Sequence, residues 1–482
     1  MSDEIFVLVR TLLSENRSLE EIRTLLSNKG FLASDIDDAI EKTASDLRLK
    51  QTDSNKKIVK KFALKEIMDR IGYGFVSHPF LNILFSFTGA SYFIIGLINA
   101  LRNVLSLVYS SFLKEFSKVH ILRKNFISRA GVVYGFSFLI MSFAVVIGSP
   151  LLFSIAFLVG ALGVVAHGEL YVKFLRDHLK SENMGSFLSK ISGYGLMITI
   201  ISMLISGFVI DFFPVTGKAV SFSLFGQTFN LIVYGYLISF EITAFAFILS
   251  GYVLSRIKQQ SVDMSVRMSS FIGKFTTKLR IHSQMFFSNK IIALLTLTSI
   301  LTGVVQILGN SFYGIFIYNH FKDQFLGGFL NVAVIFSIAA VFSFIGPWFT
   351  RNLRRHIGIS PMLVFGSLLT AMLPLSLAFN PYFVVVAVAS ALFIVGSSIL
   401  GMAQGFFTGK LLSAVERDSY FSFVGLAVSL PILILVPLGA YLGQIFGLVF
   451  LFKILIVVLV LLVTPLYFLI VLLYERKLEK AF

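Results

Sequence analysis

Polar side chains recur at helical spacing inside the apolar stretches of this 482-residue chain, and they are the residues best suited to chemistry. The three clearest stripes contain His78 and Asn82, then Gln306, Asn310 and Tyr313, and finally Gln404. In the second stripe the residues stand at i, i+4 and i+7, so one helix face carries all three. Polar groups are costly in an apolar environment, so such stripes face a cavity or another helix. We expect them to line a substrate-binding cavity, with hydrogen bonding between helices as the alternative.

Two ionisable residues, Arg102 and Glu241, fall near the centres of apolar stretches. A charge at the centre of a membrane span costs about 2.5–3.5 kcal/mol, so each needs compensation. One hypothesis is a structural ion pair between them. The other makes Glu241 a protonatable group that couples proton movement to another process.

His167 and Glu169 lie close together in a further apolar stretch. Glu169 is a second candidate for charge pairing or proton coupling, and Lys173 at i+4 is its nearest local partner. His167 lies on another face and is a cavity candidate, since imidazole titrates near neutral pH. The alternative is a hydrogen-bonded packing residue.

Composition excludes several classes of function. With 56% hydrophobic and 14% charged residues, the chain is too apolar for an ordinary soluble protein. The absence of cysteine excludes disulfides, thiolate metal sites and cysteine nucleophiles. The His residues have no metal-ligand spacing, and no glycine-rich phosphate loop precedes a helix. We therefore expect no enzyme, no cofactor and no metal site.

Basic residues gather in alternate connections between the apolar stretches. Counted from an entry near Ile67, they lie after spans 2, 4, 6, 8 and 10, and the other connections offer only Lys218 and Lys322. Short loops rich in Lys and Arg stay in the cytoplasm. The pattern predicts an integral protein of the cell membrane with both termini cytoplasmic. It also accounts for most of the net charge of +16 without nucleic acid as a partner.

Twelve spans are predicted, each near the ~20 residues that cross a bilayer as a helix. They run over 67–88, 91–113, 126–147, 150–172, 187–210, 229–254, 290–318, 325–349, 361–379, 382–408, 419–445 and 448–474. A basic amphipathic connector, 255–289, separates six spans from six and would lie on the inner leaflet. The expected fold class is an all-α integral membrane protein with two pseudo-symmetric six-helix bundles, 63–254 and 290–482.

The first 50 residues predict a separate soluble module of three helices. Apolar residues recur at helical spacing from Ile5 to Leu12, Ser18 begins a capping box, and Ser34 opens the third helix. Residues 51–62 are polar and Lys-rich, which indicates a linker. The module 1–50 is either a small packing domain or a site that recruits a cytoplasmic protein partner.

The segment from Gly89 to Ala100 resembles the connection between the first two spans, and the start of the second, in the major facilitator superfamily of secondary transporters. The loops after spans 2 and 8 are similar, in altered form, to that family's Gly-x-x-x-Asp-Arg-x-Gly-Arg-Arg signature. This likeness makes gating candidates of Glu115, Arg123, Lys124, Arg351, Arg354 and Arg355. The resemblance covers about 63–476. It implies two halves with a site between them, lined by spans 1, 4, 7 and 10.

The resemblance implies secondary-active transport of a small solute by alternating access, driven by an ion gradient, with protons as one candidate, or by the solute's own gradient. The alternative is a polytopic membrane scaffold or sensor that transports nothing and recruits a partner through residues 1–50. Polar stripes favour the first and the altered loop signatures the second. The few charges in the expected cavity favour a neutral, amphiphilic or apolar solute over a polyanion.

Overall fold

The computed structural model describes residues 57–116, 123–179, 181–224, 227–257 and 289–479, with 19–28 and a few single positions before residue 57. The chain divides into two compact units, Met1–Ala63 and Leu64–Phe482. In the first unit, α2 (Leu19–Asn28) belongs to a small apolar core made of Val9, Ile22, Leu26, Ile36 and Ala39. Residues 57–62, predicted as linker, are helical, and most of the predicted connector 255–289 lies outside the described residues.

Within the described residues, eleven helical segments are long and apolar enough to cross a membrane. Those of the N-terminal half are α5 (Tyr92–Phe116), α6 (Arg123–Val146), α7 (Pro150–His178), α8 (Ser181–Phe212) and α9 (Gly235–Ser255). Those of the C-terminal half are α11 (Lys290–Phe321), α12 (Gly328–Ile357), α13 (Ser360–Thr370) with α14 (Met372–Phe379), α15 (Phe383–Leu411), α16 (Ala414–Phe446), and α17 (Leu448–Val457) with the π-helix η1 (Val458–Val463) and α18 (Thr464–Glu479). Many large apolar side chains are exposed on these helices, as expected for surfaces that contact lipid. The unit is an integral membrane protein.

The first predicted span, 67–88, is divided in two. Residues 64–75 are helical, the helix ends at Val76, and α4 (His78–Phe87) begins after Ser77. Pro79 explains the break, because proline lacks an N–H and its ring clashes with the carbonyl four residues earlier. With 10 residues, α4 is too short to cross a bilayer alone. The break is why the count of continuous spans is eleven rather than twelve.

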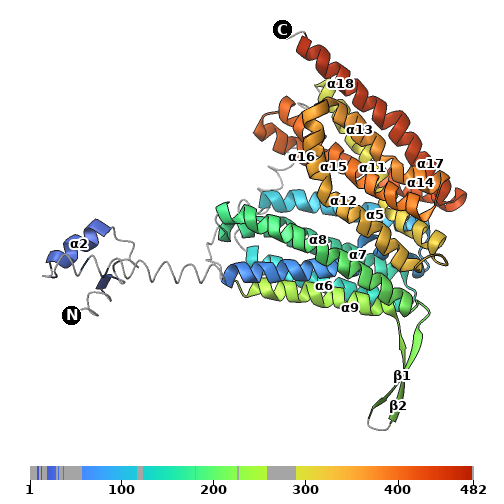
Figure 1. Ribbon diagram of the computed structural model, residues 1–482, viewed down its shortest axis with the longest axis horizontal. Coiled ribbons are helices and arrows are strands. Elements are labelled where there is room, and N and C mark those ends of the chain that lie inside the picture. Colours follow the sequence, from blue (N-terminus) through green and yellow to red (C-terminus); the bar gives the residue numbers. More distant parts are fainter. Residues whose placement is uncertain are drawn as a thin grey trace. The chain divides into compact units, whose positions relative to one another are not determined.

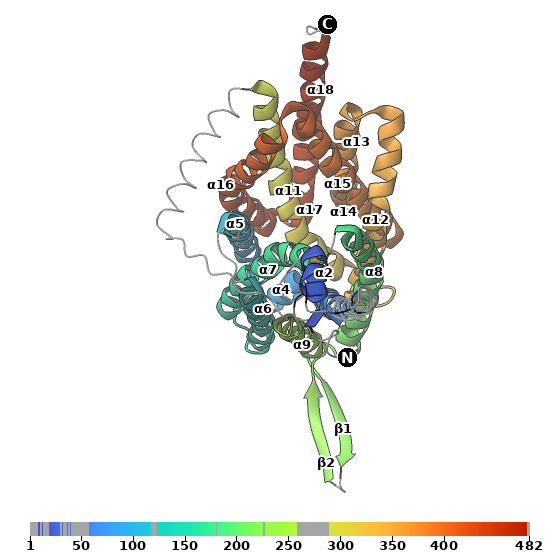
Figure 2. The same cartoon turned by 90° about the vertical axis from the view of Figure 1, so that its left-hand side faces the viewer.

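The spanning helices form two groups that correspond to the two halves of the chain (Figures 1 and 2). In the N-terminal half, α6 packs between α7 and α9, and in the C-terminal half α15 packs between α12 and α13. One apolar core continues through both groups and includes Phe138, Phe247, Phe312 and Phe452. The halves are therefore distinct bundles that share a packed interface.

A β-hairpin stands where the sixth span was predicted to begin. β1 (Lys218–Leu224) and β2 (Gln227–Val233) are antiparallel, with Phe222 opposite Phe229 and Ser221 opposite Asn230. Apolar and polar residues alternate over 220–224 and over 228–231, which is the period of a strand and not of a helix. The helix α9 consequently begins at Gly235 instead of 229, and the hairpin projects from the bundle (Figures 1 and 2). We call the end of the bundle that carries the hairpin the hairpin end, and the other end the opposite end.

Gly235 is the point where α9 packs against the end of α8. A Cβ atom there would overlap the carbonyl oxygen of Val209 and lie 2.6 Å from the Cα of Ile210. Backbone atoms cannot easily move aside, and overpacking costs about 1–3 kcal/mol. We expect Gly235→Ala to lower the apparent Tm of the purified protein in detergent by several degrees. Gly193→Ala in α8 is the matched control, because nothing lies within 4 Å of the added Cβ. Equal Tm values for the two variants would contradict this packing.

Candidate functional site

A polar cavity of about 350 Å³ lies between the two halves. Its walls come from α4 and α5 on one side and from α11 on the other. The lining residues are His78, Asn99, Arg102, Asn103, Ser106, Gln306, Ile307, Asn310 and Ser311. This size suits a small organic molecule. The structure thus brings together His78, Gln306 and Asn310, all predicted as cavity residues, and adds Arg102 to them.

Asn82 lies behind the cavity wall and connects the two halves. Its Nδ2 donates to the backbone oxygen of Asn310 at 3.1 Å and lies 3.3 Å from Nδ1 of His78. Asn99 Nδ2 in turn donates to Asn82 Oδ1 at 3.0 Å. Because Asn82 is only 1% exposed, it positions the wall and does not face a solute directly.

Arg102 is a cation on the cavity wall. Its Cζ lies 4.5 Å from the centroid of the Phe157 ring, a cation–π contact that contributes about 0.5–2 kcal/mol. Among the residues that the structure describes, no carboxylate lies within ion-pair distance of its guanidinium. Glu241 occupies an exposed position on α9, and the structure does not bring it to Arg102. The charge of Arg102 therefore remains available to the cavity.

Three other predicted site residues lie away from the cavity lining. Tyr313 is buried in the core of the C-terminal half, with 1% of its surface exposed. Gln404 donates its Nε2 hydrogen to the hydroxyl of Tyr467 on α18. Glu169 Oε1 accepts a hydrogen bond from Ser110 Oγ at 2.7 Å. Helical periodicity identifies a polar face, but it does not tell which neighbour covers that face.

The predicted gating residues lie at the opposite end of the bundle, away from the hairpin. Arg351, Arg354 and Arg355 are exposed in the last turns of α12, where the Cζ of Arg354 lies 4.3 Å from the ring centroid of Phe406 on α15. The gating candidates whose side chains fall outside the described part are Glu115, Arg123 and Lys124. Arg354 therefore packs on its own half of the bundle.

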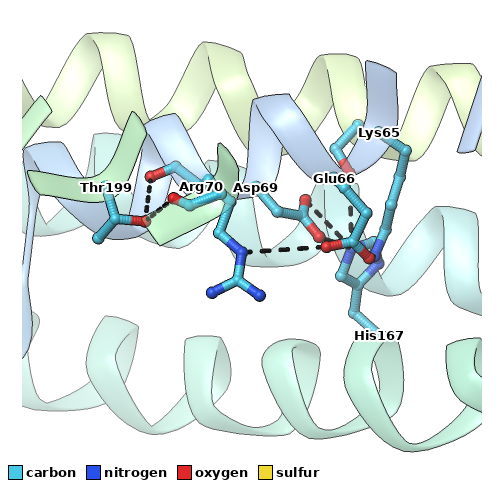
Figure 3. Close-up of polar contacts among 8 residues, drawn as sticks. Lys65, Glu66, Asp69, Arg70, His167 and Thr199 are labelled. Atoms are coloured by element: carbon cyan, nitrogen blue, oxygen red, sulfur yellow. Dashed lines mark hydrogen bonds and ion pairs between the residues drawn. The ribbon is translucent and has the colours of Figure 1, made fainter. Parts of the chain in front are cut away.

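A second polar cluster is buried within the N-terminal half (Figure 3). Lys65 Nζ lies 2.8 Å from Asp69 Oδ2 and 3.4 Å from Glu66 Oε1, all on the first span. Asp69 Oδ2 is also 3.1 Å from Nε2 of His167 on α7. His167 is 1% exposed and Asp69 is 4% exposed. Sequence analysis missed Lys65 and Asp69 because they lie at the edge of the predicted span; their i, i+4 spacing was the available signal.

Both ring nitrogens of His167 face oxygen atoms that accept hydrogen bonds. Nδ1 lies 3.2 Å from the carbonyl oxygen of Ile127 on α6, and Nε2 lies 3.1 Å from the Asp69 carboxylate. A carbonyl and an ionised carboxylate only accept, so each contact needs an N–H. Both contacts are hydrogen bonds at the same time only when the Asp69–His167 pair holds one proton more than a carboxylate beside a neutral imidazole. Ser250 Oγ on α9, 3.5 Å from Nε2, and the stacked ring of Tyr171 complete its surroundings.

Asp211 and Gly96 make two of the contacts that join the halves toward the hairpin end. The Asp211 carboxylate at the end of α8 accepts hydrogen bonds from the backbone N–H groups of Phe329 at 2.9 Å and Leu330 at 2.7 Å, where α12 begins. An acidic group is stabilising at a helix N-terminus. On the other side of the molecule (Figure 2), Gly96 of α5 packs so closely on Ala440 of α16 that a Cβ atom would overlap it. The halves therefore contact each other on both sides of the bundle.

Farther from the hairpin, α8 and α12 present exposed apolar side chains. Tyr194 and Met197 on α8 are 69% and 64% exposed, while Phe344 and Trp348 on α12 are 57% and 65% exposed. Phe208 and Phe212, near the hairpin end of α8, are likewise 56% and 50% exposed. The exposed apolar surface of α8 therefore continues along the helix, as expected for a surface that contacts lipid.

No family model and no curated protein matches this sequence, but solved structures match its fold. The nucleoside transporter NupG, as a D323A mutant, superposes with a TM-score of 0.68 at 11% identity, over 86% of this chain and 99% of that one. The chain has the major facilitator fold. A bacterial homologue of the iron transporter ferroportin, in an inward-facing state, gives 0.61 at 16% identity, over 86% and 99%. A bacterial homologue of the human lysosomal transporter Spinster, inward-facing and unoccupied, gives 0.59 at 14%, over 88% and 98%.

The sequence resemblance to the major facilitator superfamily is confirmed for the fold. Identities of 11–16% carry no further information about cargo. Two of these structures are in inward-facing states.

Replacing Asp69 by Ala removes the carboxylate shared by Lys65 and His167. Breaking a buried ion pair by removing one partner costs about 3–5 kcal/mol. We expect Asp69→Ala to lower the apparent Tm in detergent strongly, and a Lys65→Met/Asp69→Leu variant, which removes both charges, to recover part of the loss. Asp323→Ala, an exposed acid between α11 and α12, is the control and should leave Tm unchanged. An unaltered Tm for Asp69→Ala would show that the cluster does not stabilise the fold.

Proposed function

We propose that this chain is a secondary transporter that moves a small solute across a membrane by alternating access. The observation that carries the proposal is the polar cavity, which lies between the halves and takes residues from both. Counting residues 64–87 as one broken span gives twelve spans, six in each half. Rocking of the halves about a central site would then expose the cavity to each side in turn. A scaffold that transports nothing has no use for such a cavity, so transport is the better supported function.

Loop charges support an orientation with the hairpin end outside. The connections at the opposite end include basic clusters such as Arg351, Arg354 and Arg355, whereas the hairpin end offers Lys218 and Lys322. We infer that both termini are cytoplasmic and that the protein lies in the cell membrane. In this orientation the contacts of Asp211 and Gly96 lie toward the outer side, which supports an inward-facing state.

The Asp69–His167 pair supports coupling to protons. An extra proton would let both ring nitrogens of His167 donate hydrogen bonds where the first span, α6 and α7 meet. Losing the proton would set an unprotonated ring nitrogen against an oxygen acceptor and weaken this junction. The charged neighbours that shape the equilibrium are Lys65 and, beyond it, Glu66 on the first span. Protonation would thereby bias the packing of the N-terminal half.

The cavity assignment predicts the effect of a double alanine variant. Gln306→Ala with Asn310→Ala removes two hydrogen-bonding groups from the α11 wall, each worth about 1 kcal/mol. We expect uptake into proteoliposomes to fall about tenfold or more, measured with a solute found by thermal-shift screening of solute classes. Gln324→Ala, an exposed Gln near the end of α11, is the matched control and should keep full uptake. Full uptake by the double variant would exclude this cavity as the solute site, and no uptake by the natural sequence under any gradient would contradict transport.

The coupling proposal predicts a separation between accumulation and exchange. His167→Gln keeps a hydrogen-bonding side chain but cannot take up a proton near neutral pH. We expect it to lose accumulation driven by an inward proton gradient while it retains solute exchange at equal pH on both sides. A pH-sensitive dye inside proteoliposomes reports the accompanying proton flux. His320→Gln, an exposed residue near the end of α11, is the control. Proton-driven accumulation that survives His167→Gln would rule the pair out.

A further inference from the structure

The cavity wall carries positive charge that no lining residue neutralises. Arg102 belongs to the wall, and none of the residues that line the cavity is acidic. The guanidinium contacts the face of Phe157, which leaves its N–H groups without a fixed anion among the described residues. An unpaired charge in a membrane span costs about 2.5–3.5 kcal/mol. A cation kept there at such a cost indicates a ligand of opposite charge.

The broken first span adds a second source of positive potential at the same cavity. α4 begins at His78, which lines the cavity, and a helix N-terminus carries about half a positive charge in its first-turn N–H groups. The N-cap residue Ser77 makes no side-chain hydrogen bond to these groups. Transporters with discontinuous spanning helices direct such N-termini toward anionic groups of the substrate.

The remaining polar lining residues can donate hydrogen bonds. Amide groups come from Asn103, Gln306 and Asn310, and a hydroxyl comes from Ser106. Donors from both halves around one guanidinium suit a ligand that is rich in acceptors, and a planar guanidinium pairs well with a carboxylate. One fixed cation balances one negative charge. The volume of about 350 Å³ limits the ligand to a small molecule.

We propose that the cavity binds a small organic monoanion such as a carboxylate. This inference rests on the proposed transport function and narrows its solute class. It replaces the neutral or apolar solute that the sequence favoured, because the structure leaves Arg102 facing the cavity without an acidic partner among the described residues.

The absence of cysteine allows a test that does not require the solute to be known. Ser106 lines the cavity one helical turn from Arg102 on α5, so Ser106→Cys places a single thiol beside the guanidinium. Its reaction is measured with two methanethiosulfonate reagents, the anionic sulfonatoethyl and the cationic trimethylammonioethyl compound. Each rate is divided by the rate of the same reagent at Tyr382→Cys, where the native side chain is 73% exposed.

We expect the anionic reagent to react about tenfold or more faster than the cationic one after this normalisation. Arg102→Gln should abolish the preference and Arg102→Lys should keep it, each in protein that elutes as one species. Raising the salt concentration is a second readout that needs no Arg102 variant, and it should shrink the preference.

The inference would be overturned, and transport left intact, if the two reagents reacted at equal rates or if the cationic reagent reacted faster. The same conclusion would follow from an anionic preference that survives both Arg102→Gln and high salt. Failure of both reagents to react would mean that the cavity is closed to small molecules. That result would contradict the proposed transport function together with the anion site.

Discussion

The cost of a charge inside an apolar helix bundle determines where polar chemistry occurs in this protein. Lys65, Asp69 and His167 meet that cost by pairing, and all three are buried in the N-terminal half. Arg102 is treated differently, since it faces the cavity with an aromatic ring as its close contact. The paired cluster holds helices together. Arg102, which has no ion-pair partner among the described residues, is the charge that we propose to act on a ligand. Two roles thus follow from whether a charge has a partner.

The interface between the halves depends on small residues and a single carboxylate. Gly96 and Gly207 allow α5 and α8 to approach α16 and α12, and Asp211 binds the N-terminus of α12. Aromatic rings also pack between the halves at this end. The rings of Phe80 and Phe329 meet edge to face, with their centroids 5.4 Å apart. These contacts are local, so their loss would free one end without dismantling either bundle. This separation of the contacts between the halves from the packing within each half suits halves that rotate against each other.

Hydrophobic patterning predicted most spans to within a few residues, because a helix in lipid must be both long and apolar. It predicted a single first span, although Pro79 carried the signal for a break at that point. The start of the sixth span was wrong because alternation in residues 218–233 was not recognised as strand periodicity. A hydropathy average measures the apolar content of a segment. It does not distinguish the two-residue period of a strand from the 3.6-residue period of a helix.

Polar stripes predicted His78, Gln306 and Asn310 as cavity residues, and all three line one cavity in the structure. Tyr313 shares the stripe of Gln306 but is covered by neighbours within its own half, and one sequence does not reveal that packing. The partner of His167 was missed for a related reason. Asp69 is 98 residues away in the chain, and only the folded bundle brings the two together.

The hairpin connects α8 to α9, two helices of the same half, and its base is tied by the hydrogen bond from Gly235 N to Phe213 O at 2.9 Å. Under the proposed alternating access, the hairpin would therefore move with that half. Because it projects from the bundle (Figures 1 and 2), a small rotation of that half near the cavity would become a larger displacement far along the strands. A probe attached there would read the conformational state of the molecule without entering the path of the solute.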